Sequence, residues 1–283
     1  MKKLNIVVIG CSGMGKRHIK GVYENERANL YGICDIDEKR VAAANDLYHP
    51  EKTTLDWHDF VNDPAVDAAI IVMPDQLHLE MTDTFLRAGK HVLCEKPLAV
   101  NAAEGREMVA AARESGCLLM EAMVSTLNPN FRAAAARLEE IAPIRNYISS
   151  YCQYSSKYDA LKNGVVASCF KPGTAGAVRD IGVYVIYPLV ALFGRPETVR
   201  ASLRTFTTEE GVSDVHGTAY LGYEEMDATI TWSKICDSFV PTEISGEKGN
   251  IVLDEIHIAR KAGIIPHGAP SSGQGPKAGT VVI

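Results

Sequence analysis

Two features are missing from this 283-residue sequence: a long apolar run and an excess of positive charge. No stretch approaches the ~18 apolar residues that a membrane-spanning helix needs. The 29 Lys and Arg residues are outnumbered by 35 Asp and Glu residues, which gives a formal net charge of −6. Because nucleic-acid phosphates are bound mainly by positive charge, we expect neither a membrane nor a nucleic acid as a partner.

The cysteine and histidine patterns argue against a disulfide-bonded or a metal-binding protein. The seven cysteines are odd in number and contain no C-x-x-C pair, so we expect reduced thiols in a cytoplasmic protein. The histidines lack metal-ligand spacing, and we expect no metal. Val8–Cys11 mimics a lipoprotein signal, but the apolar run Leu4–Ile9 is shorter than the roughly 7–15 residues of a signal core.

The first part of the chain alternates apolar runs with helix-compatible stretches. Strands are expected at Leu4–Ile9, Leu30–Cys34, Ala68–Met73, His91–Cys94 and Leu118–Met120. Helices are expected at Met14–Asn25, Glu38–Leu47, Leu77–Ala88 and Ala102–Ser115. Apolar strands joined by helices predict βαβ units. We therefore expect residues 1–122 to form an α/β domain with a doubly wound parallel sheet.

The pattern changes after this point, and residues 123–283 are expected to form a second, α+β domain. Helices are expected at Asn130–Ile141 and Ala177–Phe193, the latter kinked at Pro188. Strands are expected at Ile144–Tyr154, Thr198–Thr207, Val215–Tyr223, Asp227–Trp232, Thr242–Ser245 and Ile251–Leu253. Period-two alternation in these runs predicts a large open mixed or antiparallel sheet. The composition of Gly268–Gly279 is typical of a flexible loop.

A glycine-rich loop lies between the first strand and the first helix. Its candidate cofactor-binding residues are Gly10, Ser12, Gly13, Met14 and Gly15. Gly10 and Gly15 fit the dinucleotide-binding pattern G-x-G-x-x-G, although Ser12 replaces the middle glycine. The same loop followed by Lys16 also resembles a P-loop, but Arg17 stands where that motif needs Ser or Thr.

Asp35 favours the dinucleotide interpretation. It ends the second expected strand, 20 residues after Gly15, which is the position of the acid that binds the adenosine ribose. A carboxylate there suits the two ribose hydroxyls of NAD and repels the 2′-phosphate of NADP. Because residues 35–37 contain no Arg, we expect NAD rather than NADP as cofactor.

A second group of motifs identifies a resemblance. Ala88–Leu93 precedes the block Cys94–Ala99, whose centre reads Glu95-Lys96-Pro97, and Met73, Pro74 and His78 lie upstream. In these residues the sequence resembles the Gfo/Idh/MocA oxidoreductases, over roughly residues 4–255. The resemblance implies an NAD(P)-dependent enzyme in which Met73, Pro74 and His78 lie along the cofactor. It also implies that Glu95 and Lys96 lie at the nicotinamide end, with Lys96 catalytic.

The block Gly176–Tyr184 extends the resemblance. It ends in Asp180-Ile181-Gly182-Val183-Tyr184, which is similar to the family's Asp-x-Gly-x-His or Asp-x-Gly-x-Tyr segment. On a helix, Asp180 and Tyr184 share one face. From the residues alone, Tyr184 could equally be a half-buried core tyrosine. The resemblance implies a catalytic role and indicates the Tyr-using branches, such as dimeric dihydrodiol dehydrogenase and the sugar 1-dehydrogenases.

The expected reaction moves a hydride between the nicotinamide and a CH–OH or C=O carbon of a sugar, polyol or dihydrodiol. Tyr184 is expected to carry the proton, because a neighbouring Lys96 ammonium would lower its pKa from about 10. Asp180 is expected to orient Lys96 or the substrate. Exchanged roles for Lys96 and Tyr184, a non-catalytic NAD-binding regulator and a P-loop nucleotide-binding protein are the alternatives.

The substrate itself is not readable from the sequence. Side chains that could line its pocket are Phe131, Arg132, Tyr151, Tyr154, Lys157, Lys171 and His216. The resemblance implies a homodimer or homotetramer assembled through the C-terminal sheet. Since family members run longer, we also expect a C-terminal piece beyond Ile283 to be missing from this chain.

Overall fold

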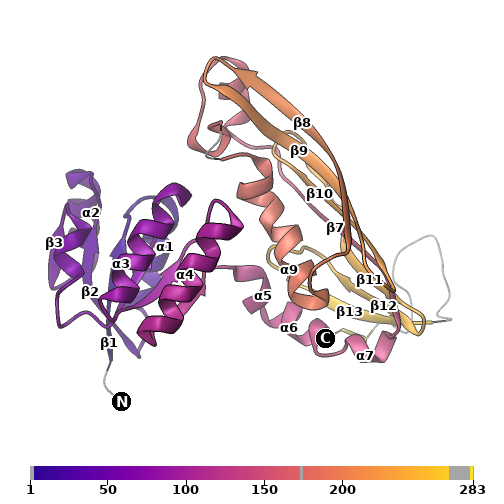
Figure 1. Ribbon diagram of the computed structural model, residues 1–283, viewed down its shortest axis with the longest axis horizontal. Helices are drawn as coiled ribbons and strands as arrows, with labels where there is room; N and C mark the ends of the chain where they lie inside the picture. Colours follow the sequence, from indigo (N-terminus) through magenta and orange to yellow (C-terminus); the bar gives the residue numbers. More distant parts are fainter. Residues whose placement is uncertain (1–2, 173–174, 268–280, 283) are drawn as a thin grey trace. The chain divides into compact units, whose positions relative to one another are not determined.

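The computed structural model describes residues 3–172, 175–267 and 281–282. The chain divides into two compact units, Met1–Ala122 and Met123–Ile283 (Figure 1), and each is described by itself. The expected loop Gly268–Gly279 lies outside the described residues.

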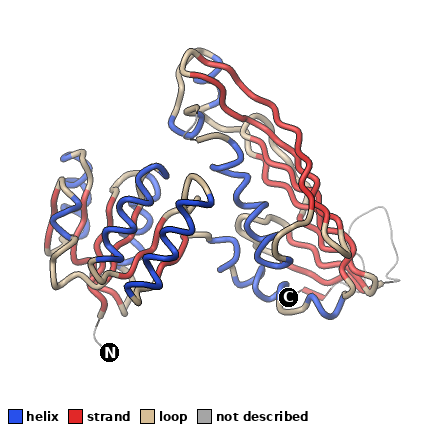
Figure 2. The backbone as a smooth tube through the Cα atoms, in the orientation of Figure 1, coloured by secondary structure: helices blue, strands red, loops and turns tan. Residues whose placement is uncertain are grey.

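The first unit is a parallel sheet with helices on both faces (Figure 2). Its strands are β1 (Leu4–Ile9), β2 (Ala28–Cys34), β3 (Lys52–Thr54), β4 (Ala68–Ile71), β5 (His91–Cys94) and β6 (Leu119–Glu121), in the order β3-β2-β1-β4-β5-β6. Its α-helices are α1 (Gly13–Tyr23), α2 (Glu38–Tyr48), α3 (His78–Arg87) and α4 (Ala102–Ser115). This strand order is that of the Rossmann fold and confirms the predicted fold class. The short edge strand β3 was not expected.

Alternation along β1 explains why helices cover both faces of the sheet. Val7 and Ile9 pack with Phe85 of α3 in one core cluster. Val8, one residue out of phase, packs with Ile19 of α1 in a second cluster. The strand order reverses between β1 and β4. The carboxyl ends of these two strands therefore form the crevice where ligands bind in such sheets.

The second unit is built on a mixed sheet of eight strands in the described part of the chain. They are β7 (Ile144–Cys152), β8 (Thr198–Thr208), β9 (Gly211–Gly222), β10 (Asp227–Ser233), β11 (Thr242–Gly246), β12 (Gly249–Leu253), β13 (Ala262–Pro266) and β14 (Val281–Val282), in the order β14-β13-β12-β11-β7-β10-β9-β8. Only β7 and β10 pair in parallel among these strands. The large mixed sheet confirms the predicted class of this unit.

One face of this sheet is covered by α9 (Val183–Phe193) (Figure 1). The inward residues of β10, including Ile230 and Trp232, share a core cluster with Val185 and Leu189 of α9. Trp232 lies close to Gly182, where a Cβ atom would approach the indole ring to 3.1 Å. The chain before α9 therefore rests directly on the carboxyl end of β10.

Two expected helices differ from the prediction. The segment Asn130–Ile141 does not form one helix: α6 (Pro129–Ala135) and α7 (Leu138–Ile141) are separate, and α5 (Val124–Leu127) precedes them. The segment Ala177–Phe193 begins with a π-helical turn, Val178–Gly182, before α9. Pro188 lies inside α9. No helix in the described ranges is long and apolar enough to cross a bilayer.

The turn between β1 and α1 yields the first prediction. A Cβ atom at Gly15 would lie 1.9 Å from the carbonyl oxygen of Gly10, so Gly15→Ala forces the backbone apart. We expect this variant to lose at least about 3 kcal/mol of unfolding free energy. Gly21, also in α1, has open space around it, and Gly21→Ala should gain about 0.4–1 kcal/mol. Chemical denaturation measures both, and equal stabilities would contradict the close-approach argument.

Candidate active site

The glycine loop has the backbone shape of a phosphate cradle. Gly10 has a φ of +102°, and a Cβ atom there would lie 2.3 Å from the carbonyl oxygen of Val72. α1 begins at Gly13, and its N-cap residue Ser12 makes no side-chain capping bond. Free N–H groups in the first turn of a helix bind anions. The residues present therefore fit the pyrophosphate of a dinucleotide.

Asp35 lies at the carboxyl end of β2 beside this loop. Its carboxylate accepts hydrogen bonds from the backbone N–H groups of Cys11 (2.8 Å) and Asp37 (3.0 Å), and the residue is only 6% exposed. These bonds fix the acid at the position expected for ribose recognition. Residues 35–37 contain no Arg, as the sequence shows, but the fold brings one close from further along the chain. Arg40, in the first turn of α2, places its guanidinium 3.5 Å from Asp35 and 3.3 Å from Asp37.

The segment that carries Lys96 is held first by Glu95. One Glu95 oxygen lies 2.8 Å from Nε2 of His18 on α1, and the other accepts the Lys96 N–H at 3.0 Å. Burial by itself would raise the pKa of Glu95. The bonds from His18 and from the Lys96 backbone outweigh it and hold the pKa below its ordinary value of 4.5. Glu95 thus ties the cofactor-binding helix to the Lys96 segment as an ionised carboxylate.

His78 holds the same segment from the other side. It is 1% exposed. Its Nδ1 lies 3.0 Å from the carbonyl oxygen of Pro97, and its Nε2 lies 2.9 Å from that of Met73. His78 therefore bridges the segments that follow β4 and β5. Pro74 caps the short 3₁₀ helix Asp75–Leu77 that leads from Met73 to His78.

Glu121, at the end of β6, completes this arrangement. Its carboxylate accepts the Leu98 N–H at 2.9 Å. Burial, together with the negative charge of Glu95, raises the pKa of Glu121 above its ordinary value. We call the set of Glu95, His78 and Glu121 the Lys96 clamp, because together they bond backbone atoms at positions 96, 97 and 98.

The second unit gathers the other candidate residues at the carboxyl ends of β7 and β10. Asp180, in the π-helical turn, forms an ion pair with Lys234, which follows β10. The ring of Tyr184, in the first turn of α9, packs edge-on against Tyr151 of β7 at 5.4 Å between centroids. His257, from the segment between β12 and β13, stacks on Tyr151 at 4.3 Å.

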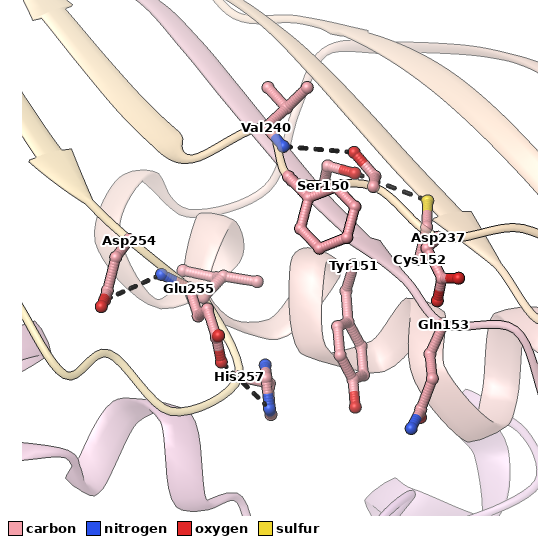
Figure 3. A pocket seen from close by; sticks show the side chains of 12 residues that line it. Ser150, Tyr151, Cys152, Gln153, Asp237, Val240, Asp254, Glu255 and His257 are labelled. Atoms are coloured by element: carbon pink, nitrogen blue, oxygen red, sulfur yellow. Dashed lines mark hydrogen bonds and ion pairs between the residues drawn. The ribbon is translucent and has the colours of Figure 1, made fainter. Parts of the chain in front are cut away.

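These aromatic residues adjoin a cavity of about 280 Å³, drawn in Figure 3. Tyr151 and His257 form part of its wall, and the hydroxyl of Tyr151 and the amide of Gln153 point the same way. Burial lowers the pKa of His257 below its usual value, which favours the neutral ring. Burial, followed by the charges of Asp180 and Glu255, raises the pKa of Tyr151. The cavity wall thus offers the hydroxyl of Tyr151 and the ring of His257 as hydrogen-bonding groups, beside the acidic side chains of Asp237, Asp254 and Glu255.

The structure places the predicted residues in two groups. Gly10, Ser12, Gly13, Met14, Gly15 and Asp35 lie at the β1–α1 turn and the end of β2, and Met73, Pro74, His78, Glu95 and Lys96 lie around the clamp. Asp180 and Tyr184 lie in the second unit, where Asp180 forms an ion pair with Lys234. Of the pocket candidates, Tyr151 lines the cavity and Phe131 is buried in the core.

Five polar contributors were not predicted as site residues: His18, Arg40, Glu121, Lys234 and His257. Arg40 could have been found, because it lies one helical turn after the N-cap Asp37. Lys234 and His257 follow strand ends with no motif around them. Across the residues that the structure describes, no three His, Cys, Asp or Glu side chains come together as a metal site.

Comparison with known proteins identifies the class. A sequence model of an oxidoreductase family with an NAD-binding Rossmann fold matches residues 4–123, and the Gfo/Idh/MocA C-terminal domain matches residues 140–252. The scyllo-inositol 2-dehydrogenase (NADP(+)) IolU of Bacillus subtilis is 38% identical, over 90% of this chain and 77% of its own length. The levoglucosan dehydrogenase of Pseudarthrobacter phenanthrenivorans is 29% identical, over 92% and 77%. An NAD-binding oxidoreductase from Klebsiella pneumoniae, of known crystal structure, superposes with a TM-score of 0.83 at 25% identity, over 99% of this chain and 79% of its own.

The protein is therefore a nicotinamide-nucleotide-dependent oxidoreductase with a Rossmann domain. The chain belongs to the Gfo/Idh/MocA family, and it is an NAD(P)-dependent dehydrogenase or reductase that acts on CH–OH and C=O groups. The family membership confirms the predicted resemblance and excludes the P-loop and non-catalytic alternatives. It does not confirm the dihydrodiol dehydrogenase branch.

Glu95 gives a prediction that depends on pH. Its pKa is lower in the folded chain than its ordinary value of 4.5. The ionised carboxylate therefore stabilises the fold above about pH 4.5, and this contribution is lost as the pH falls through the folded pKa. At pH 7, Glu95→Gln should cost about 1–3 kcal/mol of unfolding free energy, and the difference from wild type should shrink below pH 4.5.

Denaturant unfolding at pH 7 and pH 3.5 measures both differences. Glu24→Gln is the matched control, because Glu24 is the exposed C-cap residue of α1 and forms a surface ion pair with Lys20. Exposed pairs contribute little, so the control should change stability by less than about 1 kcal/mol at either pH. A pH-independent cost of Glu95→Gln would contradict the role of the carboxylate.

Proposed function

We propose that the substrate is a sugar or another polyol. The relatives named for scyllo-inositol and levoglucosan support this class. So does the cavity beside Tyr151 and His257, whose 280 Å³ lies near the lower end of the roughly 300–1,000 Å³ typical of small-molecule sites. Oxidation of inositols, aldoses and anhydrosugars should be compared with that of trans-dihydrodiols. The dihydrodiols belong in the panel because Tyr184 occupies the position where the Tyr-using branches differ from the His-using ones.

The cofactor would be held mainly by backbone groups. The N-terminus of α1 and the loop Gly10–Gly15 suit its pyrophosphate, and Asp35 suits the adenosine ribose. Met73, Pro74, His78 and Glu95 line the path from there to Lys96, in keeping with the family resemblance. When bound, the nicotinamide ring accepts or donates the hydride.

Tyr184 is the proposed proton carrier. During oxidation the substrate carbon loses a hydride, its C–H bond breaks, and the C–O bond becomes a C=O bond. The hydroxyl proton passes to the phenolate oxygen of Tyr184, and in reduction it returns along the same path. Lys96 is the proposed electrostatic partner that favours the phenolate. The observation that carries this assignment is the Lys96 clamp, in which the buried side chains of His78 and Glu95 and the partly buried Glu121 fix one short segment.

Substitution of Tyr184 tests the assignment directly. Tyr184→Phe removes the hydroxyl and keeps the ring that packs on Tyr151. We expect kcat to fall about 10²–10⁴-fold, which is the usual contribution of general acid–base catalysis, with little change in stability. Tyr187→Phe, one turn further along α9, is the matched control and should keep kcat within about twofold. Steady-state kinetics over pH 6–10 provides the measurement.

The exchanged assignment has its own signature. If Lys96 carried the proton, Lys96→Met would lower kcat far more than Tyr184→Phe. An unchanged kcat in Tyr184→Phe would refute the proposed role of the tyrosine.

We also propose NAD as the preferred cofactor, since the buried carboxylate of Asp35 would repel a 2′-phosphate. Arg40 beside it would attract that phosphate and narrow the preference. We expect kcat/KM to be higher with NAD than with NADP in the wild type. The ratio should increase in Arg40→Ala and reverse in Asp35→Ser. A wild-type preference for NADP would overturn the proposal, and an unchanged ratio in Arg40→Ala would show that Arg40 has no part in the choice.

The assembly and location of the protein remain predictions. A homodimer or homotetramer through the C-terminal sheet is proposed on the family resemblance, and a cytoplasmic location on the reduced thiols. Sedimentation of the purified protein tests the first of these.

A further inference from the structure

Lys234 is a buried cation that the catalytic assignment leaves without a role. Its side chain is 6% exposed. Its backbone N–H bonds the carbonyl oxygen of Val215, and its carbonyl oxygen accepts the N–H of Ser155, both at 2.9 Å. Its ammonium lies 5.0 Å from the centre of the Phe170 ring. An ammonium so far from water is costly unless an anion or strong acceptors compensate it.

The compensating anion is Asp180, which lies on the element that carries Tyr184. The other deeply buried lysine of the described chain differs in this respect. Lys90 donates to the backbone carbonyl oxygens of Asp63 and Val66, each at 2.8 Å. These bonds stabilise the fold and involve no side chain of the candidate site. Lys234 instead pairs with a side chain that is 36% exposed and belongs to the Asp-x-Gly-x-Tyr block.

The π-helical turn explains why this pairing is possible. π-helical turns occur frequently at functional sites. The turn Val178–Gly182 is pressed against Trp232, since Gly182 leaves no room for a Cβ atom beside the indole. Trp232 and Lys234 both come from the end of β10, two residues apart. One limits the approach of the turn sterically, and the other attracts its carboxylate.

The charge of Asp180 reaches the neighbouring aromatic rings. It contributes to raising the pKa of Tyr151, after burial, and Tyr151 packs on Tyr184. His257, which is favoured in its neutral form, also lies among these rings, with the Glu255 carboxylate 3.6 Å away. The charges of Arg260 and Asp254 act on His257 as well, with opposite effects on its pKa. The Lys234 ammonium is the buried cation that faces the Asp180 carboxylate in this arrangement.

We propose that Lys234 is a positioning residue of the active site, which fixes the Asp180 carboxylate and neutralises its charge one helical turn from Tyr184. The proposal rests on the proposed role of Tyr184 as proton carrier. It assigns Lys234 no contact with substrate or cofactor.

The test is the pH profile of kcat for polyol oxidation with NAD. Lys234→Met removes the ammonium that faces the Asp180 carboxylate, so more of that negative charge acts on Tyr184 and disfavours the phenolate. We expect the acidic limb of the profile to move up by about one pH unit, and kcat at pH 7 to fall about tenfold. Asp180→Asn leaves the ammonium uncompensated and should move the same limb to lower pH. The double variant should return the limb to its wild-type position.

Lys90→Met is the matched control for loss of a buried lysine. It should lower the melting temperature and leave the pH profile in place. Lys234→Arg, which keeps the positive charge, should keep the wild-type limb. If Lys234→Met does not fold, the predicted shift of the acidic limb to lower pH in Asp180→Asn tests the positioning role.

Unshifted profiles in both single variants, or shifts of the same sign, would overturn the proposal. Failure of the proposed function is a separate result: Tyr184→Phe would then retain wild-type kcat. If Tyr184→Phe is inactive while the Lys234 and Asp180 variants keep the wild-type profile, only the positioning role is refuted.

Discussion

The first unit depends on a single constraint, the requirement that the chain leaving β5 take one fixed path at Lys96. Polar groups from three elements meet this requirement: His18 of α1 contacts Glu95, the buried His78 of α3 contacts the Pro97 carbonyl group, and Glu121 of β6 accepts the Leu98 N–H. Each of these contacts joins a polar side chain to a backbone N–H or carbonyl group, or to another polar side chain, in a place with little water. Breaking one would leave its partner unsatisfied, which costs more than the bond itself contributes. The glycine loop, the sheet edge and the Lys96 segment are thereby fixed relative to one another within the unit.

The second unit is subject to a different constraint, because charged groups lie close to aromatic rings and their charges must be compensated. The ammonium of Lys234 and the carboxylate of Asp180 compensate each other at the edge of the core. Burial keeps His257 largely neutral and keeps Tyr151 protonated. The cavity wall therefore combines aromatic hydrogen-bonding groups with acidic side chains that can accept hydrogen bonds, which suits a substrate rich in hydroxyl groups. The Lys234–Asp180 pair is therefore more easily understood as part of the site than as a source of stability.

The sequence predicted the features that follow from local rules. The parallel sheet followed from apolar runs separated by helices, and the cofactor loop followed from Gly10, Gly15 and the spacing to Asp35. Contacts that join distant segments were out of reach. The pairing of Lys234 with Asp180 spans 54 residues, and Asp180 lies in a π-helical turn. The periodicity used to predict helices describes α-helical turns only, so it could not predict this π-helical turn. The prediction of one helix over Asn130–Ile141 was wrong, because an alanine-rich composition is also compatible with several short helices. Tertiary contacts decide where each of these helices ends. The position of Arg40 near Asp35 was not predicted, because Arg40 lies beyond residues 35–37 and reaches Asp35 only through the first turn of α2.

The parallel pairing of β7 with β10 has a consequence for how the protein reaches this structure. Asn146 pairs with Asp227, so about 80 intervening residues, including α9 and the β8–β9 hairpin, must be accommodated before the two strands join. Pairings of such high contact order form slowly, because the entropy of closing the loop is lost before the contacts compensate for it. The carboxyl ends of these same strands carry Tyr151 and lead into Lys234. The groups of the proposed site in this unit are thus brought together by the β7–β10 pairing, which joins residues far apart in the sequence. The β1–α1–β2 segment around Asp35, by contrast, assembles from residues close together in the sequence.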